Sequence, residues 1–171
     1  MKQIKLRSKK HPGLVALIDD EDYDLVSRYR WHPSWNKNAK TFYAIRNISV
    51  NGKRTTVSMH RLILGLDFGD KRQGDHRNFN GLDCQRHNLR IATTAQNMAN
   101  TQRSRGSSRF KGVAWHSNSQ KWVAMICIDG KRMNLGRRNS EIECAYLYDK
   151  AALKYFGEYA LTNEMMGLLD G

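Results

Sequence analysis

Long hydrophobic runs are absent from this sequence of 171 residues. A helix that crosses a bilayer needs about 20 predominantly apolar residues, so we expect no membrane-spanning helix and no membrane partner. The N-terminal stretch MKQIKLRSKKHPG is basic but lacks the apolar segment of a signal peptide. These two absences predict a cytoplasmic protein.

Cysteine is also scarce. The three cysteines, Cys84, Cys127 and Cys144, are widely spaced and form no CxxC pair. An odd number of isolated cysteines argues against a disulfide framework and against a structural zinc site built from cysteine pairs. Reduced thiols in a cytosol are the simple interpretation.

Acidic residues are few compared with basic ones: 16 Asp and Glu stand against 29 Lys and Arg, which gives a net charge of +13. Residues 101–139 carry nine Lys or Arg and one acid, Asp129, whereas residues 140–171 carry two Lys and six acids. Basic surfaces attract polyanions, of which nucleic acid is the commonest. The alternative is a soluble protein that is merely basic.

Local patterns predict an α+β protein in two parts. Asn51-Gly52 and Asp129-Gly130 each lie between β-rich runs, which is typical of tight hairpins. Ser140–Glu143 has the S-x-x-E pattern of a capping box, so a helix is expected over 141–156. The other expected strands are 14–18, 109–115, 121–129 and 131–136, and the other expected helices are 19–29, 60–66 and 93–102. The polar, basic stretch TQRSRGSS at 101–108 is predicted to be a linker.

Four polar side chains form the first candidate site. If two strands pair around them and a helix follows, Asp75, His76, Asn88 and Asn97 converge. Asp75 and the side-chain carbonyl of Asn97 are oxygen ligands suited to a hard cation such as Mg²⁺, which would stabilise charge on a scissile phosphate. Neutral His76 would deprotonate the attacking water, and Asn88 would hold its imidazole by the other nitrogen.

The stretch MHRLILGL followed by GDHRNFNGLDCQRHNLRIATTAQNMAN resembles the HNH nuclease motif of phage and intron-encoded homing endonucleases. The resemblance implies a ββα-metal core within 59–100, in an HNH domain over 1–100 that has an N-terminal β-rich extension. It implies that Asp75 and Asn97 are metal ligands, that His76 is the general base, and that Asn88 positions it. Many family members have His where Asn97 stands, and Asn there favours Mg²⁺ or Mn²⁺ over zinc.

Other interpretations of this region remain open. The four polar residues are also compatible with a degenerate scaffold whose Asp and Asn side chains only cap loops. Cys84 and His87 have a metal-like spacing, but no second Cys/His pair completes a zinc set. Arg61 would either contact a phosphate or hold a short helix to the core, and His60 is expected to be structural.

Residues 109–165 resemble the AP2 DNA-binding domain. The resemblance is carried by FKGVAW, KWVA, LG, the helix AYLYDKAA and a closing Asn. It implies a three-stranded antiparallel sheet that enters the DNA major groove and one helix packed behind it. Met125 and Cys127 stand where plant members carry Glu and Arg, which puts the plant recognition sequence in doubt.

Side-chain alternation suggests which residues of this sheet face DNA. The predicted phosphate-contacting or DNA-contacting residues are Arg61, Lys111, Trp115, Lys121, Arg132 and Asn134. Among these, Arg132 and Asn134 could read bases, as Arg does guanine and Asn adenine. For Trp115 and for Trp122, packing in the core is an equal alternative.

Together these features predict a metal-dependent, site-preferring DNA endonuclease of the homing type. The expected cofactor is one divalent metal, Mg²⁺ or else Mn²⁺, and the expected partner is double-stranded DNA in a bacterial host cell. A monomer is expected, and a dimer stays open. The rival is a non-catalytic AP2-type DNA-binding regulator with an HNH scaffold. An RNA-directed protein is disfavoured because the deep, narrow RNA major groove would not admit the sheet.

Overall fold

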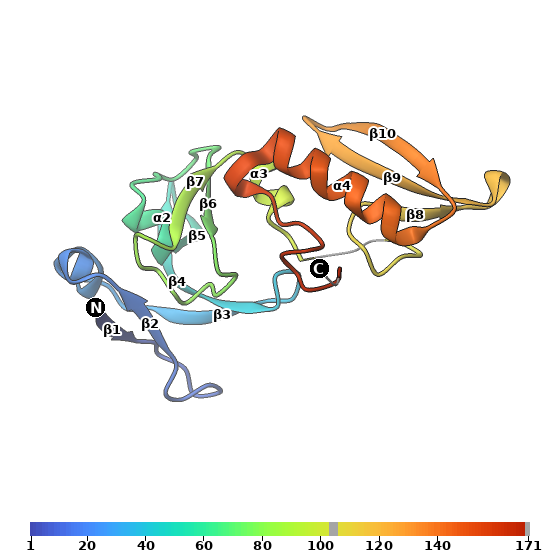
Figure 1. Ribbon diagram of the computed structural model, residues 1–171. Coiled ribbons are helices and arrows are strands. Elements are labelled where there is room, and N and C mark those ends of the chain that lie inside the picture. The colour runs from blue at the N-terminus through green and yellow to red at the C-terminus, as the bar shows by residue number, and fades with distance from the viewer. Residues whose placement is uncertain (103–105, 170–171) are drawn as a thin grey trace. The chain divides into compact units, whose positions relative to one another are not determined.

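The computed structural model describes residues 1–102 and 106–169, and the chain divides into two compact units, Met1–Thr93 and Thr94–Gly171 (Figure 1). Both units combine helices with small antiparallel sheets, in agreement with the predicted mixture of α and β structure. The boundary between the units precedes the predicted linker at 101–108. Residues 103–105 of that linker lie outside the described residues.

Three small antiparallel sheets make up the strands of the first unit: β1–β2, β3–β4–β5 and β6–β7. Its elements are β1 (Lys2–Lys5), β2 (Val15–Ile18), η1 (Asp20–Asp22), α1 (Tyr23–Ser27), β3 (His32–Asn36), β4 (Thr41–Val50), β5 (Lys53–Ser58), α2 (Met59–Ile63), β6 (Gln73–His76) and β7 (Leu89–Ala92).

The β4–β5 hairpin turns where the sequence predicts it. Asn51 and Gly52 both have positive φ, 50° and 74°, as a two-residue hairpin of this kind requires. Strands β1 and β3 were not predicted. Pro33 lies within β3, and it is tolerated because β3 is an edge strand that pairs only with β4.

The N-terminal extension and the HNH-like segment share one hydrophobic core. Ile18, Val26 and Trp31 from the extension pack in the same buried cluster as Met59 and Cys84. The buried indole of Trp31 donates to the carbonyl of Val26 at 2.9 Å, so its polar atom is satisfied. The extension is therefore part of the body that carries Asp75 and His76, rather than a separate module.

The second unit is a three-stranded sheet, in the order β10–β9–β8, with one long helix against it (Figure 1). Its elements are α3 (Thr94–Ala99), β8 (Val113–His116), η2 (Ser117–Ser119), β9 (Lys121–Ile128), β10 (Lys131–Arg138), α4 (Glu141–Phe156) and η3 (Gly157–Tyr159). The helix begins where predicted, because the Ser140 side chain accepts a hydrogen bond from the Glu143 amide.

Helix α3 packs with the second unit, which explains why the boundary lies ahead of the predicted linker. The carbonyl of Ala99 accepts from the amide of Leu161 at 3.3 Å and from the ammonium group of Lys111. Part of the predicted linker is also folded here, since Ser108 is buried and the Ser107 hydroxyl accepts from the amide of Trp115 at 2.8 Å.

Candidate active site and DNA-contacting sheet

The β6–β7 hairpin positions the two central residues of the candidate active site. Asp75 and His76 are the last two residues of β6, and they pair across the hairpin with Arg90 and Leu89. Both side chains are buried, with 6% and 5% of their surface exposed. Burial of two adjacent ionisable side chains is uncommon, and it is typical of sites where chemistry needs controlled protonation.

Arg90 neutralises Asp75. Its Nε lies 2.7 Å from Oδ2 of Asp75, and Arg90 is itself only 7% exposed. A buried carboxylate needs such a partner, because an unpaired charge in the protein interior costs several kcal/mol. This role of Arg90 was not predicted from the sequence. The cross-strand register that places it opposite Asp75 depends on where the two strands pair.

His76 lies among aromatic side chains. Its ring centroid is 5.5 Å from that of Tyr43 and 4.8 Å from that of His60, and its Nε2 is 4.0 Å from the Cys84 sulfur. Burial lowers the pKa of His76 to about 4, although the nearby carboxylates of Asp75 and Asp83 act in the opposite direction. The imidazole is therefore neutral near pH 7, which is the form that can accept a proton.

Asn88 holds the loop between β6 and β7 rather than the imidazole of His76. Its side chain donates to the Asp83 carbonyl at 2.8 Å and accepts from the Asn78 amide at 3.0 Å. The Asp83 carboxylate in turn accepts from the Asn78 side chain at 2.7 Å. The predicted direct contact with His76 is thus replaced by an indirect one, in which Asn88 fixes the loop that follows the histidine.

A cluster of charges ties this loop to the N-terminal extension. The guanidinium of Arg86 binds the carboxylates of Asp22 and Glu21, each at 2.6 Å, and the Arg86 amide donates to Asp19 at 2.7 Å. The hydrogen bond from Arg86 is the main cause that lowers the pKa of Asp19. The extension therefore supports the loop that carries Asn88.

Arg61 binds the loop that follows its own helix, and its predicted contact with a phosphate stays a prediction. Its guanidinium donates to three backbone carbonyls, those of Arg72 at 2.8 Å and of Asp67 and Asp70 at 3.1 Å each. These contacts hold the loop that connects α2 to β6. Satisfying three carbonyls uses most of the donor capacity of the guanidinium group.

His60 is buried on α2 and packs directly on β6. A Cβ atom at Gly74 would lie 2.5 Å from the His60 ring, so only glycine permits this approach. Burial lowers the pKa of His60 to about 3, and its Nδ1 has no hydrogen-bond partner among the described residues. The uncharged ring completes the wall around His76.

Asn97 lies on α3, in the second unit, and its role as a metal ligand stays a prediction. Within residues 1–102 and 106–169, no three His, Cys, Asp or Glu side chains are grouped so that they could hold a metal. One carboxylate and one amide oxygen, completed by water and phosphate, suit Mg²⁺, which keeps several waters when bound. Both predicted ligands offer oxygen, the donor type that a hard cation prefers and that suits zinc less well.

The sheet of the second unit has one face against α4 and one face away from it. Trp122 and Ile126 of β9 pack in the clusters formed with α4, so the alternate residues Met125 and Cys127 point the other way. Arg132 and Asn134 pair with Cys127 and Met125, and both are exposed. Lys121 shares this outer face and is also exposed. These three predicted DNA-contacting residues therefore lie on one accessible surface.

Two residues predicted for this DNA-contacting set lie elsewhere. Lys111 is 7% exposed, and its ammonium group donates to the carbonyls of Ala99 and Leu161. Trp115 pairs with Trp122 across the strands, and the two rings meet edge to face at 5.2 Å, on the side of the sheet that faces α4. Lys111 is structural in this arrangement, because its ammonium group is enclosed by backbone carbonyls. Trp115 remains 41% exposed but lies on the opposite side of the sheet from Lys121, Arg132 and Asn134, so its predicted contact with DNA stays a prediction.

Comparison with known proteins gives two separate similarities, and no family model matches the chain. The chain is 27% identical over 157 residues to the uncharacterized HNH endonuclease L560 of Acanthamoeba polyphaga mimivirus, a match that covers 90% of this chain and 76% of that protein. It is 42% identical over 62 residues to ethylene-responsive transcription factor WRI1 of Arabidopsis thaliana, which covers 35% of this chain and 14% of that protein.

The chain is also 40% identical over 62 residues to a second plant protein, AP2-like ethylene-responsive transcription factor At1g16060 of Arabidopsis thaliana. This match covers 35% of this chain and 18% of that protein. The chain thus has distant similarity to an HNH endonuclease along most of its length and to AP2-type proteins along about a third. It spans less than a fifth of either transcription factor. No helix among the described residues is long and apolar enough to cross a membrane.

Proposed function

We propose that this protein is a metal-dependent DNA endonuclease of the homing type. The observation that carries the proposal is the buried Asp75-His76 pair at the end of β6, with Asp75 neutralised by Arg90 and His76 uncharged. Buried ionisable groups with a shifted pKa and a specific charged partner cluster at functional sites. The distant similarity to an HNH endonuclease over 90% of the chain supports the same conclusion.

His76 is the general base in this proposal. It takes the proton of a water molecule that attacks the scissile phosphorus, and the bond to the leaving oxygen breaks. Tyr43, His60 and Cys84 hold the ring by packing, while the loop clamped by Asn88 fixes the backbone that follows. Rigid support of this kind keeps a catalytic group in its productive orientation.

Asp75 and Asn97 are proposed to hold one divalent cation, Mg²⁺ or else Mn²⁺. When bound, such a cation stabilises negative charge on the phosphate and on the leaving oxygen. Arg90 contributes by fixing one oxygen of the Asp75 carboxylate, because carboxylates that bind metals are usually held by a further hydrogen bond.

The outer face of the β8–β10 sheet is proposed to bind double-stranded DNA. Lys121 and Arg132 supply positive charge, and Arg132 with Asn134 could contact base edges in the major groove. The side chain of Asn134 already accepts from the Gly136 amide at 2.9 Å, which fixes its orientation at a β-bulge. Similarity to AP2-type transcription factors over 35% of the chain supports a DNA-binding role for this sheet.

Cleavage of supercoiled plasmid tests the proposal. Wild-type protein with Mg²⁺ is expected to give nicked or linear product, and either EDTA or His76→Ala is expected to abolish it while DNA binding persists. Arg132→Ala is expected to weaken binding and to leave the single-turnover cleavage rate at saturating protein unchanged. Tight binding without any cleavage in Mg²⁺ or Mn²⁺, over many DNA sequences, would instead favour the non-catalytic regulator.

A further inference from the structure

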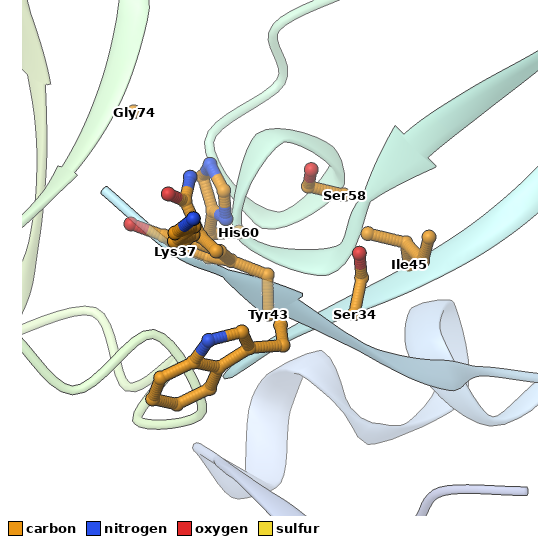
Figure 2. Close-up of a pocket in the computed structure, with 9 residues that line it drawn as sticks. Ser34, Lys37, Tyr43, Ile45, Ser58, His60 and Gly74 are labelled. Carbon is orange, nitrogen blue, oxygen red and sulfur yellow. The ribbon is translucent and has the colours of Figure 1, made fainter. Parts of the chain in front are cut away.

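A pocket of about 430 Å³ lies in the first unit (Figure 2), and two of the residues that line it, Tyr43 and His60, also contact the His76 ring. Its floor is one face of the β3–β5 sheet, and α2 and β6 contribute its wall through His60 and Gly74. Tyr43 lines the pocket and also contacts the His76 ring at 5.5 Å. The pocket is therefore separated from the proposed general base by a single layer of side chains.

The side chain of Asn36 at the pocket accepts hydrogen bonds from the amides of Asn38 and Ala39, whereas the three hydroxyl groups that line the pocket bind no protein group among the described residues. Ser58 is the residue before α2, yet its hydroxyl makes no capping hydrogen bond. Ser34 and Tyr43 face each other across β3 and β4, and their hydroxyls likewise have no hydrogen-bond partner within the part of the chain that the structure describes. Hydroxyls that point into an open pocket without protein partners are suited to contact a polar ligand.

The chain segment that forms the floor of the pocket carries charge of one sign. Residues 25–66, which contain the whole β3–β5 sheet, carry eight Lys or Arg and no Asp or Glu. Among them, Lys37 follows β3 directly, lines the pocket and is exposed. A cation and three hydroxyls that line the same pocket offer the chemistry that recognises a phosphate and its sugar.

We propose that this pocket binds one nucleotide of the cleaved DNA strand, next to the scissile phosphate. Lys37 contacts the phosphate of that nucleotide, and Ser34, Ser58 and Tyr43 contact its sugar-phosphate backbone. The volume suits a single nucleotide rather than a longer segment. This inference rests on the proposed nuclease function, and it assigns to the β-rich extension the task of aligning the strand with His76.

Two variants test the pocket, each with a matched control. Lys37→Ala removes the cation, and Lys53→Ala removes the same charge from the start of β5, outside the pocket. Ser34→Tyr fills the pocket without changing charge, and Ser49→Tyr places the same side chain at the far end of β4, on the same face of the sheet. Circular dichroism and a thermal melt establish that each variant is folded.

The first measurement is binding to a 30-base-pair duplex in EDTA, by fluorescence anisotropy across a range of salt concentrations. Because no cleavage is needed, this result is independent of whether the protein proves to be a nuclease. Lys37→Ala and Ser34→Tyr are expected to bind ~10-fold more weakly than wild type. Lys37→Ala is also expected to reduce the slope of log Kd against log salt by about one, the value for one phosphate contact. Both controls are expected to behave as wild type.

The second measurement is the rate of plasmid nicking in Mg²⁺, where the two pocket variants are expected to lose kcat/KM and the controls to retain it. Wild-type binding and nicking by both pocket variants would overturn the inference. Equal weakening by Lys37→Ala and Lys53→Ala would overturn it as well, because diffuse electrostatic attraction would then account for the effect.

Discussion

The buried ion pair between Arg90 and Asp75 makes a quantitative prediction for Arg90→Met. Methionine keeps the volume and the apolar stem but leaves the Asp75 carboxylate in a site that is 6% exposed. Removing one partner of a buried pair costs roughly 3–5 kcal/mol, since the remaining charge is desolvated and unpaired. That is a large part of the roughly 5–15 kcal/mol that stabilises a typical domain.

The control variants separate charge from packing. Arg54→Met, at an exposed position of β5, is expected to change the free energy of unfolding by less than about 0.5 kcal/mol. Adding Asp75→Asn to Arg90→Met is expected to recover much of the loss, because no unpaired charge remains. The assay is urea denaturation followed by the fluorescence of Trp31 and Trp35, which both lie in the same unit as the ion pair. Trp115 and Trp122 are replaced with Phe in all variants so that they do not contribute.

Divalent metal adds a further arm to this experiment. If Asp75 binds a cation, Mg²⁺ replaces part of the lost positive charge and stabilises Arg90→Met more than it stabilises the double variant. A loss below about 1 kcal/mol for Arg90→Met, or an equal loss for Arg54→Met, would refute the argument that burial makes this pair important. An equal effect of Mg²⁺ on both variants would refute Asp75 as a metal ligand.

Three further predictions concern the second unit. Asn163→Ala is expected to destabilise the second unit by roughly 3–5 kcal/mol in urea titrations, because this fully buried side chain forms hydrogen bonds with both backbone groups of Lys111 and with the carboxylate of Asp149. The control is Asn118→Ala at an exposed position, and a loss below about 1 kcal/mol for Asn163→Ala would contradict the expectation. Burial lowers the pKa of Lys111 to about 8, and the carboxylate of Asp149 opposes this shift. Between pH 8 and 10.5, the ordinary pKa of lysine, the unfolded chain therefore holds a proton that the folded chain has released. The free energy of unfolding consequently rises with pH in this range, by up to about 1.4 kcal/mol per pH unit. The variant Lys111→Met is expected to lack this gain, and an identical pH dependence of the two proteins would disprove it. Gly112→Ala is expected to lower the melting temperature, because a Cβ there would lie 1.9 Å from the Tyr148 ring at a φ of +76°; an unchanged melt would show that this approach is not required.

Local signals in the sequence predicted the elements that hold the candidate site. Asn51-Gly52 and Asp129-Gly130 form their turns, and the Ser140 cap begins its helix, because these preferences act within a few residues. The adjacency of Asp75 and His76 is also a local fact, and pattern alone identified it. The strands β1 and β3 were not predicted from the sequence. Each is stabilised by pairing with another strand, β1 with β2 and β3 with β4, and β3 forms in spite of Pro33.

The tertiary structure decided how individual side chains are used. Arg61 binds carbonyls of the loop between α2 and β6, and Lys111 donates to buried carbonyls. Asn88 holds the loop between β6 and β7 rather than the imidazole of His76. Each of these outcomes depends on partners that folding brings together, and a polar residue takes whichever buried partner leaves fewest groups unsatisfied. Sequence alone determined that a carboxylate and an imidazole, those of Asp75 and His76, stand next to each other in the chain. Only the fold supplied Arg90, the aromatic wall and the pocket beside them, because burial and cross-strand register are properties of the packed chain.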